Sequence, residues 1–266
     1  MSPQPVMNDP SVMHGLHAPA QALVTGASSG IGLAVVRVLL DNHDVARVYA
    51  VARGAQDNAA LAELARLHGD RLLPIAADLT SATDLQALAA SVGGRTDVLH
   101  LVFNAAGVLH APGLRPEKSL QSLRAQALAE VFALNAFAPV LLVQALLPLL
   151  RHHAPIVLAS LSARVGSIGD NQLGGWYAYR ASKAAQNQLW RTLSIELRRT
   201  HPTASCVLLH PGTVDTPLSQ PFQGGVPAGR LFTPEVAARQ LLAIVARMTP
   251  ADSGCFHAWD GSEIPW

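Results

Sequence analysis

The sequence predicts a single α/β domain in which a parallel β-sheet is covered by helices on both faces. Short runs that are apolar throughout alternate along the chain with longer segments of helical period. A glycine-rich turn joins the first of these runs to the first helical segment. The chain has 266 residues, enough for one large buried core. Strands that are apolar on both faces need a layer of helices on each side.

The elements follow in order along a chain divided into an irregular tail, residues 1–19, and a domain, residues 20–266. Strands are expected at 21–25, 46–52, 71–76, 98–104, 156–161 and 204–210. Helices are expected at 31–40, 58–68, 83–91, 119–150 and 177–200. The Gly/Pro-rich segment 217–232 interrupts this alternation, and a loop of that length is a lid or a disordered insertion. We expect a lid.

Composition excludes several classes of partner and compartment. Charged residues make up 14% of the chain, and 19 Lys and Arg balance 18 Asp and Glu, so we expect neither nucleic-acid nor membrane binding. Two cysteines, Cys206 and Cys255, are too few for a disulfide framework and indicate a reducing, cytoplasmic location. No secretory signal is visible, and the longest apolar stretch, 136–150, is shorter than a membrane span.

The first strand is followed by the sequence Thr25-Gly26-Ala27-Ser28-Ser29-Gly30-Ile31-Gly32. In a strand–turn–helix context, such glycines allow a tight turn, a close approach to a pyrophosphate and close helix–strand packing. The following helix offers unpaired N–H groups to phosphate. An ordinary strand–helix turn is the alternative explanation, because glycines alone are a weak signal.

A second motif, Tyr179-x-x-x-Lys183, places a phenol and an ammonium on one face of a helix. A phenol with a pKa of about 10 is a poor acid–base catalyst at neutral pH. A neighbouring ammonium favours the phenolate and lowers that pKa. As an isolated motif this pair would more simply be an amphipathic helix with a surface lysine.

Together with Asp78, Phe103-Asn104-Ala105-Ala106-Gly107 and Pro211-Gly212-Thr213-Val214-Asp215-Thr216, these motifs resemble the short-chain dehydrogenase/reductase family. The resemblance extends from about residue 20 to the end, although Phe103 replaces the first Asn of the family's NNAG motif. It implies a Rossmann-type, doubly wound parallel sheet of about seven strands. It further implies an oxidoreductase that transfers hydride between nicotinamide and a carbonyl or alcohol. Tyr179 would be the general acid/base, Lys183 would hold the ribose, and Asn135 would position a relay water.

The resemblance assigns a nicotinamide cofactor to the glycine-rich turn and the loops beside it. Arg53 follows the second strand, where NAD enzymes carry an acid, so NADP is favoured and NAD remains possible. A solvated arginine is the alternative reading of this residue. The expected cofactor-binding residues are Gly26, Ser28, Ser29, Gly30, Ile31, Gly32, Arg53, Asp78, Leu79, Asn104, Ala105, Ala106, Gly107, Tyr179, Lys183, Pro211, Gly212, Val214 and Thr216.

The serine that polarises the carbonyl is where the sequence departs from the family. Counting back from Gly166 puts Ala163 in the usual position, with Ser162 one residue earlier. A one-residue shift at the end of a strand can reverse the direction of a side chain. We expect Ser162 to act, with Ser160 as the alternative.

The segment 162–183 and the C-terminal Trp259–Trp266 resemble the C-factor-like and sniffer-like carbonyl-reductase branch, which implies a homodimer or homotetramer. A cofactor-binding signalling protein with vestigial activity is the alternative function. The expected substrate is a neutral, partly apolar aldehyde or ketone, held between Val108, Leu109, Leu173, Trp176, Phe222 and Phe232. No metal is expected, because the pairs His14/His17 and His152/His153 have no third ligand at a recognisable spacing.

Overall fold

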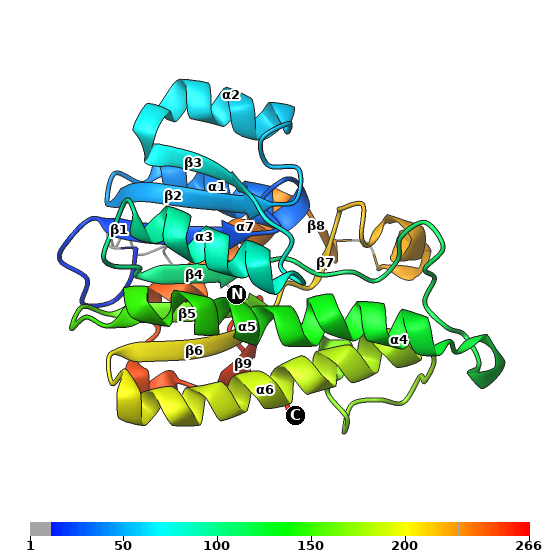
Figure 1. Ribbon diagram of the computed structural model, residues 1–266. Helices are drawn as coiled ribbons and strands as arrows, with labels where there is room; N and C mark the ends of the chain where they lie inside the picture. Colours follow the sequence, from blue (N-terminus) through cyan, green and yellow to red (C-terminus); the bar gives the residue numbers. More distant parts are fainter. Residues whose placement is uncertain (1–11, 228) are drawn as a thin grey trace.

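A computed structural model describes residues 12–227 and 229–266 as an α/β domain built on one parallel sheet (Figure 1). Its seven strands follow the order β3-β2-β1-β4-β5-β6-β9, and every pairing is parallel. The order reverses between β1 and β4, which creates the crevice where α/β sheets bind ligands. The strands are β1 (Ala20–Thr25), β2 (Val45–Ala52), β3 (Leu72–Ala76), β4 (Leu101–Asn104), β5 (Ile156–Leu161), β6 (Ala204–His210) and β9 (Cys255–Ala258).

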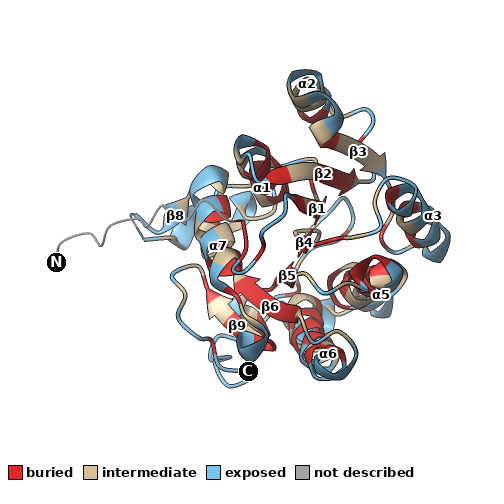
Figure 2. Ribbon diagram, turned by 90° about the vertical axis from the view of Figure 1, so that its left-hand side faces the viewer, coloured by how far each residue is buried: buried red, intermediate tan, exposed pale blue. Residues whose placement is uncertain are grey.

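Helices cover both faces of the sheet, as expected from strands that are apolar on both sides (Figure 2). One core lies beneath α1 (Gly30–Asp41), α2 (Ala59–His68) and α7 (Pro234–Arg247). The other lies beneath α3 (Ala82–Gly93), α5 (Ala138–Leu146) and α6 (Tyr177–Thr200). A shorter helix, α4 (Ala125–Phe132), packs beside α6. The expected doubly wound fold is confirmed.

The expected single helix over 119–150 is wrong. Helix α4 begins only at Ala125, a π-helical turn over Ala133–Phe137 follows it, and α5 passes into a 3-10 turn over Leu147–Leu150. By length and composition alone, Ala125–Leu150 could cross a membrane, and it is longer than the apolar stretch expected from sequence. Half of its most apolar window is buried inside the protein, so packing in the core accounts for its composition.

Three further segments differ from the sequence expectation. The segment 217–232 contains a 3-10 turn, Gln220–Gly225, and ends in β8 (Leu231–Phe232), which pairs in parallel with β7 (Thr213–Val214). Helix α7 and strand β9 complete the fold where the sequence indicated no element. Of the expected N-terminal tail, residues 1–11 lie outside the described part, whereas Val12, Met13 and Leu16 are buried in the core beneath α1 and α7.

Candidate active site

The turn between β1 and α1 requires two of its glycines for steric reasons. Gly26 has φ +65°, and a Cβ atom there would lie 2.8 Å from the backbone of Ala105 and Ala106. A Cβ at Gly32 would overlap the carbonyl oxygen of Gly26. Ser29 precedes the helix and makes no capping hydrogen bond with its side chain, so the first N–H groups of α1 remain available to a ligand.

A cavity of about 730 Å³ lies beside this turn, at the carboxyl ends of the strands. We call it the larger cavity. It brings together sixteen of the nineteen residues expected to bind a cofactor, which confirms that the separate motifs converge. These are Gly26, Ser28, Ser29, Gly30, Ile31, Gly32, Arg53, Asp78, Leu79, Ala105, Ala106, Gly107, Tyr179, Lys183, Pro211 and Thr216.

The other three expected residues lie elsewhere. Asn104 is 1% exposed and lines no cavity, because its side chain is used inside the sheet. It accepts a hydrogen bond from Thr25 Oγ1 at 2.6 Å and donates one to Ser160 Oγ at 2.8 Å, which ties β1, β4 and β5 together. Gly212 and Val214 line a second, smaller cavity instead.

Arg53 and Asp78 face the larger cavity from the ends of neighbouring strands. The Asp78 carboxylate accepts hydrogen bonds from the hydroxyl and the backbone N–H of Thr80, which lower its pKa, and the Arg53 charge adds to this effect. Arg53 itself is exposed and has no salt-bridge partner among the described residues. Its guanidinium is therefore available to an anionic group.

Tyr179 and Lys183 lie in the first two turns of α6, and Tyr179 lines both cavities. Lys183 is 4% exposed, and its Nζ lies 5.9 Å from the centre of the Tyr179 ring. Nζ donates hydrogen bonds of 2.9 Å to the Leu161 carbonyl and to Gln186 Oε1. Burial raises the pKa of Tyr179 to about 12 and lowers that of Lys183 to about 7. The phenol therefore holds its proton at neutral pH, and the expectation that the Lys183 ammonium lowers the Tyr179 pKa is wrong here, because burial dominates.

Asn135 lies within the π-helical turn and is fully buried. Its side-chain amide exchanges two 2.8 Å hydrogen bonds with the backbone of Val108 and donates a longer one to Ser182 Oγ. A Cβ atom at Gly107 would lie 3.3 Å from Asn135 Oδ1 and 3.8 Å from Lys183 Nζ, so these groups adjoin. The π turn therefore joins the loop after β4 to the helix that carries Tyr179, consistent with the frequent use of such turns at functional sites.

The two candidate serines differ in their surroundings, because Ser160 lies within β5 whereas Ser162 follows the last residue of that strand. Ser160 is buried, accepts hydrogen bonds from Asn104 and Gln186, and lines neither cavity. Ser162 lines both cavities, as does Tyr179. Its hydroxyl donates a 2.6 Å hydrogen bond to Asn187 Oδ1, and the Asn187 Nδ2 atom is buried without a partner among the described residues. Sequence reasoning missed Asn187, although it lies only one helical turn after Lys183.

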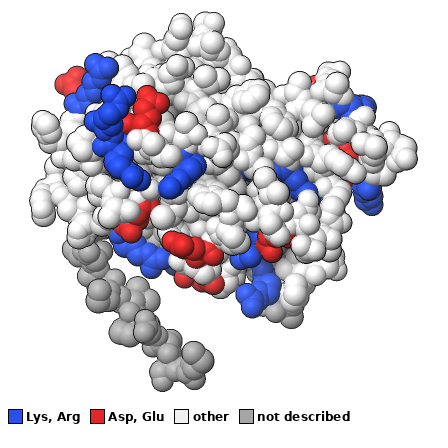
Figure 3. Space-filling view, turned by 90° about the horizontal axis from the view of Figure 1, so that it is seen from below, with Lys and Arg blue, Asp and Glu red and all other residues white. Residues whose placement is uncertain are grey.

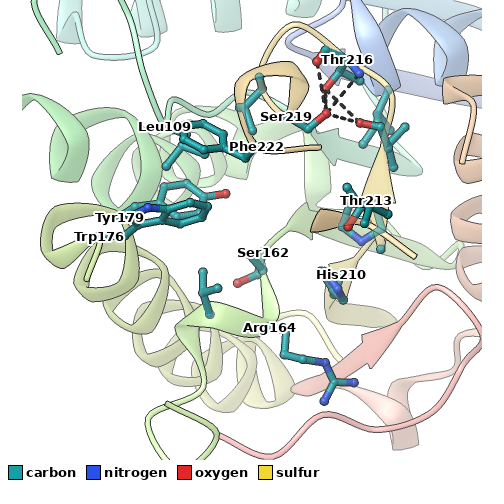
Figure 4. Close-up of a pocket in the computed structure, with 18 residues that line it drawn as sticks. Leu109, Ser162, Arg164, Trp176, Tyr179, His210, Thr213, Thr216, Ser219 and Phe222 are labelled. Carbon is teal, nitrogen blue, oxygen red and sulfur yellow. Dashed lines mark hydrogen bonds between the residues drawn. The ribbon is translucent and has the colours of Figure 1, made fainter. Parts of the chain in front are cut away.

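The smaller cavity, about 240 Å³, opens beside Tyr179 and is largely apolar (Figure 4). Ser162 lies between Tyr179 and His210 in this view. Of the expected substrate walls, Leu109, Trp176 and Phe222 line this cavity and Val108 lines the larger one. Leu173 and Phe232 do not: Leu173 is 92% exposed, and Phe232 packs on the Trp259 ring.

The first turn of α6 is fixed by Glu117, a residue that no sequence motif identifies. Glu117 is 3% exposed and accepts two hydrogen bonds from this turn. Its backbone carbonyl accepts one from Trp176 N–H, and its carboxylate accepts one from Ala178 N–H. Trp176 has φ +51°, an unusual conformation for a bulky residue. Its ring lies 6.2 Å from that of Tyr179 and 4.9 Å from that of Phe222. Glu117 thus places the aromatic wall next to the phenol.

Residues 20–225 match the sequence profile of the short chain dehydrogenases. The chain belongs to this family. It is 33% identical, over 92% of its length and 98% of the relative's, to 1-hydroxy-2-glutathionyl-2-methyl-3-butene dehydrogenase of Rhodococcus sp. strain AD45. It is also 38% identical to the C-signal of Myxococcus xanthus, over 52% of this chain and 78% of that protein. The oxidoreductase assignment and the C-factor-like branch are confirmed.

Solved structures of this short-chain dehydrogenase branch superpose closely. The NADPH-bound carbonyl reductase from chicken fatty liver has a TM-score of 0.80 and 32% identity, and it covers 94% of this chain and all of that one. The carbonyl reductase Sniffer of D. melanogaster has the same TM-score and coverage, with 28% identity. Likeness over the whole domain places the present fold among carbonyl reductases.

Proposed function

We propose that the protein is an NADP(H)-dependent carbonyl reductase or alcohol dehydrogenase in which Tyr179 is the general acid/base. The observation that carries this proposal is the position of Tyr179 on the wall shared by the two cavities, with buried Lys183 one turn further along α6. A carbonyl in the smaller cavity and a nicotinamide in the larger one would both adjoin the phenol. Phosphate-bearing dinucleotides are bound by relatives of this fold, such as the chicken enzyme.

The larger cavity fits such a dinucleotide. The open N-terminus of α1 suits a pyrophosphate, Asp78 and Leu79 suit an adenine, and Lys183 suits the hydroxyls of a nicotinamide ribose. Arg53 offers a forked cation to a ribose 2′-phosphate where NAD enzymes carry an acid. The bound cofactor supplies or accepts the hydride at the carbonyl carbon.

The protein's own residues handle the proton. In reduction, Tyr179 gives its phenolic proton to the carbonyl oxygen as the hydride reaches the carbon, and the product is an alcohol. Lys183 stabilises the phenolate that remains and returns a proton to it. A pKa of about 12 keeps Tyr179 in its protonated, donor form at neutral pH, as proton donation to the carbonyl oxygen requires.

Ser162 polarises the carbonyl, and Asn187 controls the direction of its hydroxyl. With the present amide orientation, the only proton of Ser162 goes to Asn187 Oδ1. Rotating the amide by half a turn would bring the unpartnered Nδ2 to Ser162 Oγ and release the serine proton to the substrate. Asn187 is therefore a positioning residue for Ser162.

The substrate is a neutral, partly apolar aldehyde or ketone. Leu109, Trp176 and Phe222 give the smaller cavity its apolar surface. Arg164 also borders it, but its guanidinium lies 3.4 Å from the Asp170 carboxylate and is half-exposed. The cation is thus already matched by an acid rather than reserved for an anionic substrate.

The remaining assignments are a cytoplasmic homodimer or homotetramer of one domain that binds neither nucleic acid nor membrane. Phe137 at the end of the π-helical turn, Leu141 on α5 and Ile195 on α6 are large apolar side chains that are exposed in the single chain, which supports association through this part of the surface. Acidic and basic side chains are interspersed over the face shown in Figure 3. Sedimentation at several concentrations tests the assembly.

The segment 217–232 would act as a lid, because Leu218 and Phe222 reach the smaller cavity.

The test is NADPH and NADH oxidation by purified protein against a panel of aldehydes, ketones and diketones. We expect turnover with NADPH that Tyr179→Phe abolishes while NADPH binding persists. Tight NADPH binding with equal activity in Tyr179→Phe would contradict the assigned acid. Tight NADPH binding without turnover of any compound in the panel would contradict the proposed reductase activity. It would favour the alternative of a cofactor-binding signalling protein.

A further inference from the structure

The edge strand β9 carries two potential metal ligands outside both cavities. Cys255 pairs with Val207 and His257 with Leu209 in the register of β6 and β9, so their side chains project from the same face of the sheet. That face is the one covered by α1 and α7, because Val207 and Leu209 belong to the core beneath these helices. Both side chains are only partly covered, because β9 is the edge strand of the sheet formed by the described residues.

A tight turn after β9 returns a third ligand to the same place. Gly261 N–H donates to the Ala258 carbonyl, and Ala258 N–H donates to Ser262, each at 2.8 Å. The returning chain pairs His257 with Glu263 in an antiparallel bridge. Glu263 is thus held directly opposite His257 by backbone hydrogen bonds rather than by a mobile tail.

The three side chains converge. One ligand atom from each of Cys255, His257 and Glu263 lies within 4.8 Å of the other two. Bonds of 2.0–2.3 Å around a tetrahedral zinc ion separate its ligands by about 3.3–3.8 Å. Binding of an ion would draw the three ligand atoms closer together than they lie in its absence.

None of these ligand atoms has another function within the described part of the chain. His257 Nδ1 is buried without a hydrogen-bond partner, an arrangement that costs free energy unless something binds there. The Cys255 thiol and the Glu263 carboxylate make no hydrogen bond or salt bridge with described residues. The neighbouring carboxylate of Asp252 is committed to Thr249.

We propose that Cys255, His257 and Glu263 bind a divalent transition-metal ion of the zinc type. A thiolate, an imidazole and a carboxylate form the donor set that zinc prefers, whereas Mg²⁺ and Ca²⁺ prefer oxygen alone. Three protein ligands leave one position for water. The proposal replaces the sequence-based expectation that no metal binds, and it does not depend on the proposed function.

The bound ion would fasten the C-terminal segment to the edge of the sheet. Trp259 lies between the ligands in sequence, and its ring lies 4.7 Å from that of Phe232 in β8. Strand β8 pairs with β7, whose residues Thr213 and Val214 line the smaller cavity. The site therefore stabilises a segment on which the wall of that cavity rests.

Cobalt titration of the untagged, chelator-treated full-length protein tests the site. We expect one equivalent of Co²⁺ to produce a thiolate-to-metal charge-transfer band that Zn²⁺ removes by competition. Cys255→Ser should abolish the band, and His257→Asn and Glu263→Gln should each weaken binding by at least about tenfold. Cys206→Ser and Glu196→Gln, a buried thiol and an exposed carboxylate elsewhere, are the matched controls and should bind normally.

Thermal unfolding with and without Zn²⁺ provides the second measurement. The wild-type chain should unfold at a higher temperature with Zn²⁺, and Cys255→Ser should lose this difference without losing its fold. Absence of a charge-transfer band at about 1 mM Co²⁺, where only very weak sites stay empty, would overturn the proposal. An unchanged band in Cys255→Ser would overturn it as well.

Discussion

The larger and smaller cavities meet at Tyr179 but are lined by different kinds of residue. Glycines and alanines that follow β1 and β4 line part of the larger cavity, where they allow a ligand to approach the backbone closely. The smaller cavity is made of side chains, contributed by loops after β4, β5 and β6 and by the first turn of α6. The wall that contains Tyr179 therefore separates a surface suited to a common ligand from a surface suited to one class of substrate.

This difference indicates that the larger cavity performs the binding common to the family and that the smaller cavity selects the substrate. A backbone cradle serves any chain that needs the same ligand, because it depends on a few glycines at fixed spacing. Side-chain walls change with every substitution. Substitutions should therefore affect the two halves separately, and the following predictions test this from the largest expected effect to the smallest.

Tyr179→Phe affects the junction itself. Loss of the general acid should lower kcat by about 10³-fold, within the range for positioned acid–base groups. NADPH binding, followed by nucleotide fluorescence, should remain within about twofold, since the larger cavity keeps its glycine turn. A large loss of both quantities would show that the two cavities are not separable at Tyr179.

Ser162→Ala should lower kcat by about 10²-fold, the cost of one hydrogen bond to the developing oxyanion. Asn187→Asp should also lower kcat, because a carboxylate holds the serine proton away from the substrate. In the double variant the two losses should not add, since both act through one hydroxyl. Additive losses, or a change in KM alone, would assign Asn187 a merely structural role.

His210, which lines the smaller cavity, makes the free energy of unfolding depend on pH. Burial lowers its pKa from 6.5 to about 4, so between these pH values the unfolded chain binds more protons than the folded one. The free energy of unfolding should therefore fall as the pH decreases from 6.5 to 4. His210→Gln should reduce this loss by about 2 kcal/mol in urea unfolding at pH 7 and pH 4.5. An identical loss in the variant would contradict the assignment.

Arg53→Ala affects only the larger cavity. Without the guanidinium, KM for NADPH should rise by about tenfold while KM for NADH stays constant, because only NADPH carries the 2′-phosphate. Arg37→Ala, at an exposed arginine of α1 outside both cavities, is the control. Equal changes for both cofactors would remove the arginine from 2′-phosphate recognition.

Phe222→Ala should have the smallest effect and only on the substrate side. Losing a ring that packs on Trp176 should raise KM for apolar ketones by roughly threefold to tenfold, with little change in KM for NADPH. Leu173→Ala is the control, since Leu173 is exposed and lines neither cavity. A larger effect from Leu173 would mean that the loop around it closes over bound substrate.

Most of the larger cavity could be predicted from sequence, because its residues occur in contiguous motifs at the ends of strands. Asn104 was also expected to contact cofactor, and the structure shows its side-chain amide hydrogen-bonded within the sheet. Leu173 and Phe232 were expected in the substrate wall because they are apolar residues of the loops around the site, yet neither lines the smaller cavity. Neither burial nor direction of a loop side chain follows from residue type.

The long helix predicted over 119–150 failed for a related reason. Its apolar composition indicates helix throughout, but a π turn places Asn135 between the loop after β4 and α6. Only contacts between segments distant in sequence stabilise that turn. The same holds for Glu117, which fixes the start of α6 from a position sixty-one residues before Ala178.

By itself, the sequence determined the alternation of strands and helices, the parallel sheet covered on both faces and the pair Tyr179 and Lys183 on one helix face, because local periodicity and short spacings encode them. Only the tertiary structure decided between Ser160 and Ser162 at the cavity wall, paired Ser162 with Asn187, and brought Cys255, His257 and Glu263 together. The physical reason is that these choices depend on the direction of side chains from separate segments. That direction is fixed when the segments pack, and no spacing along the chain specifies it.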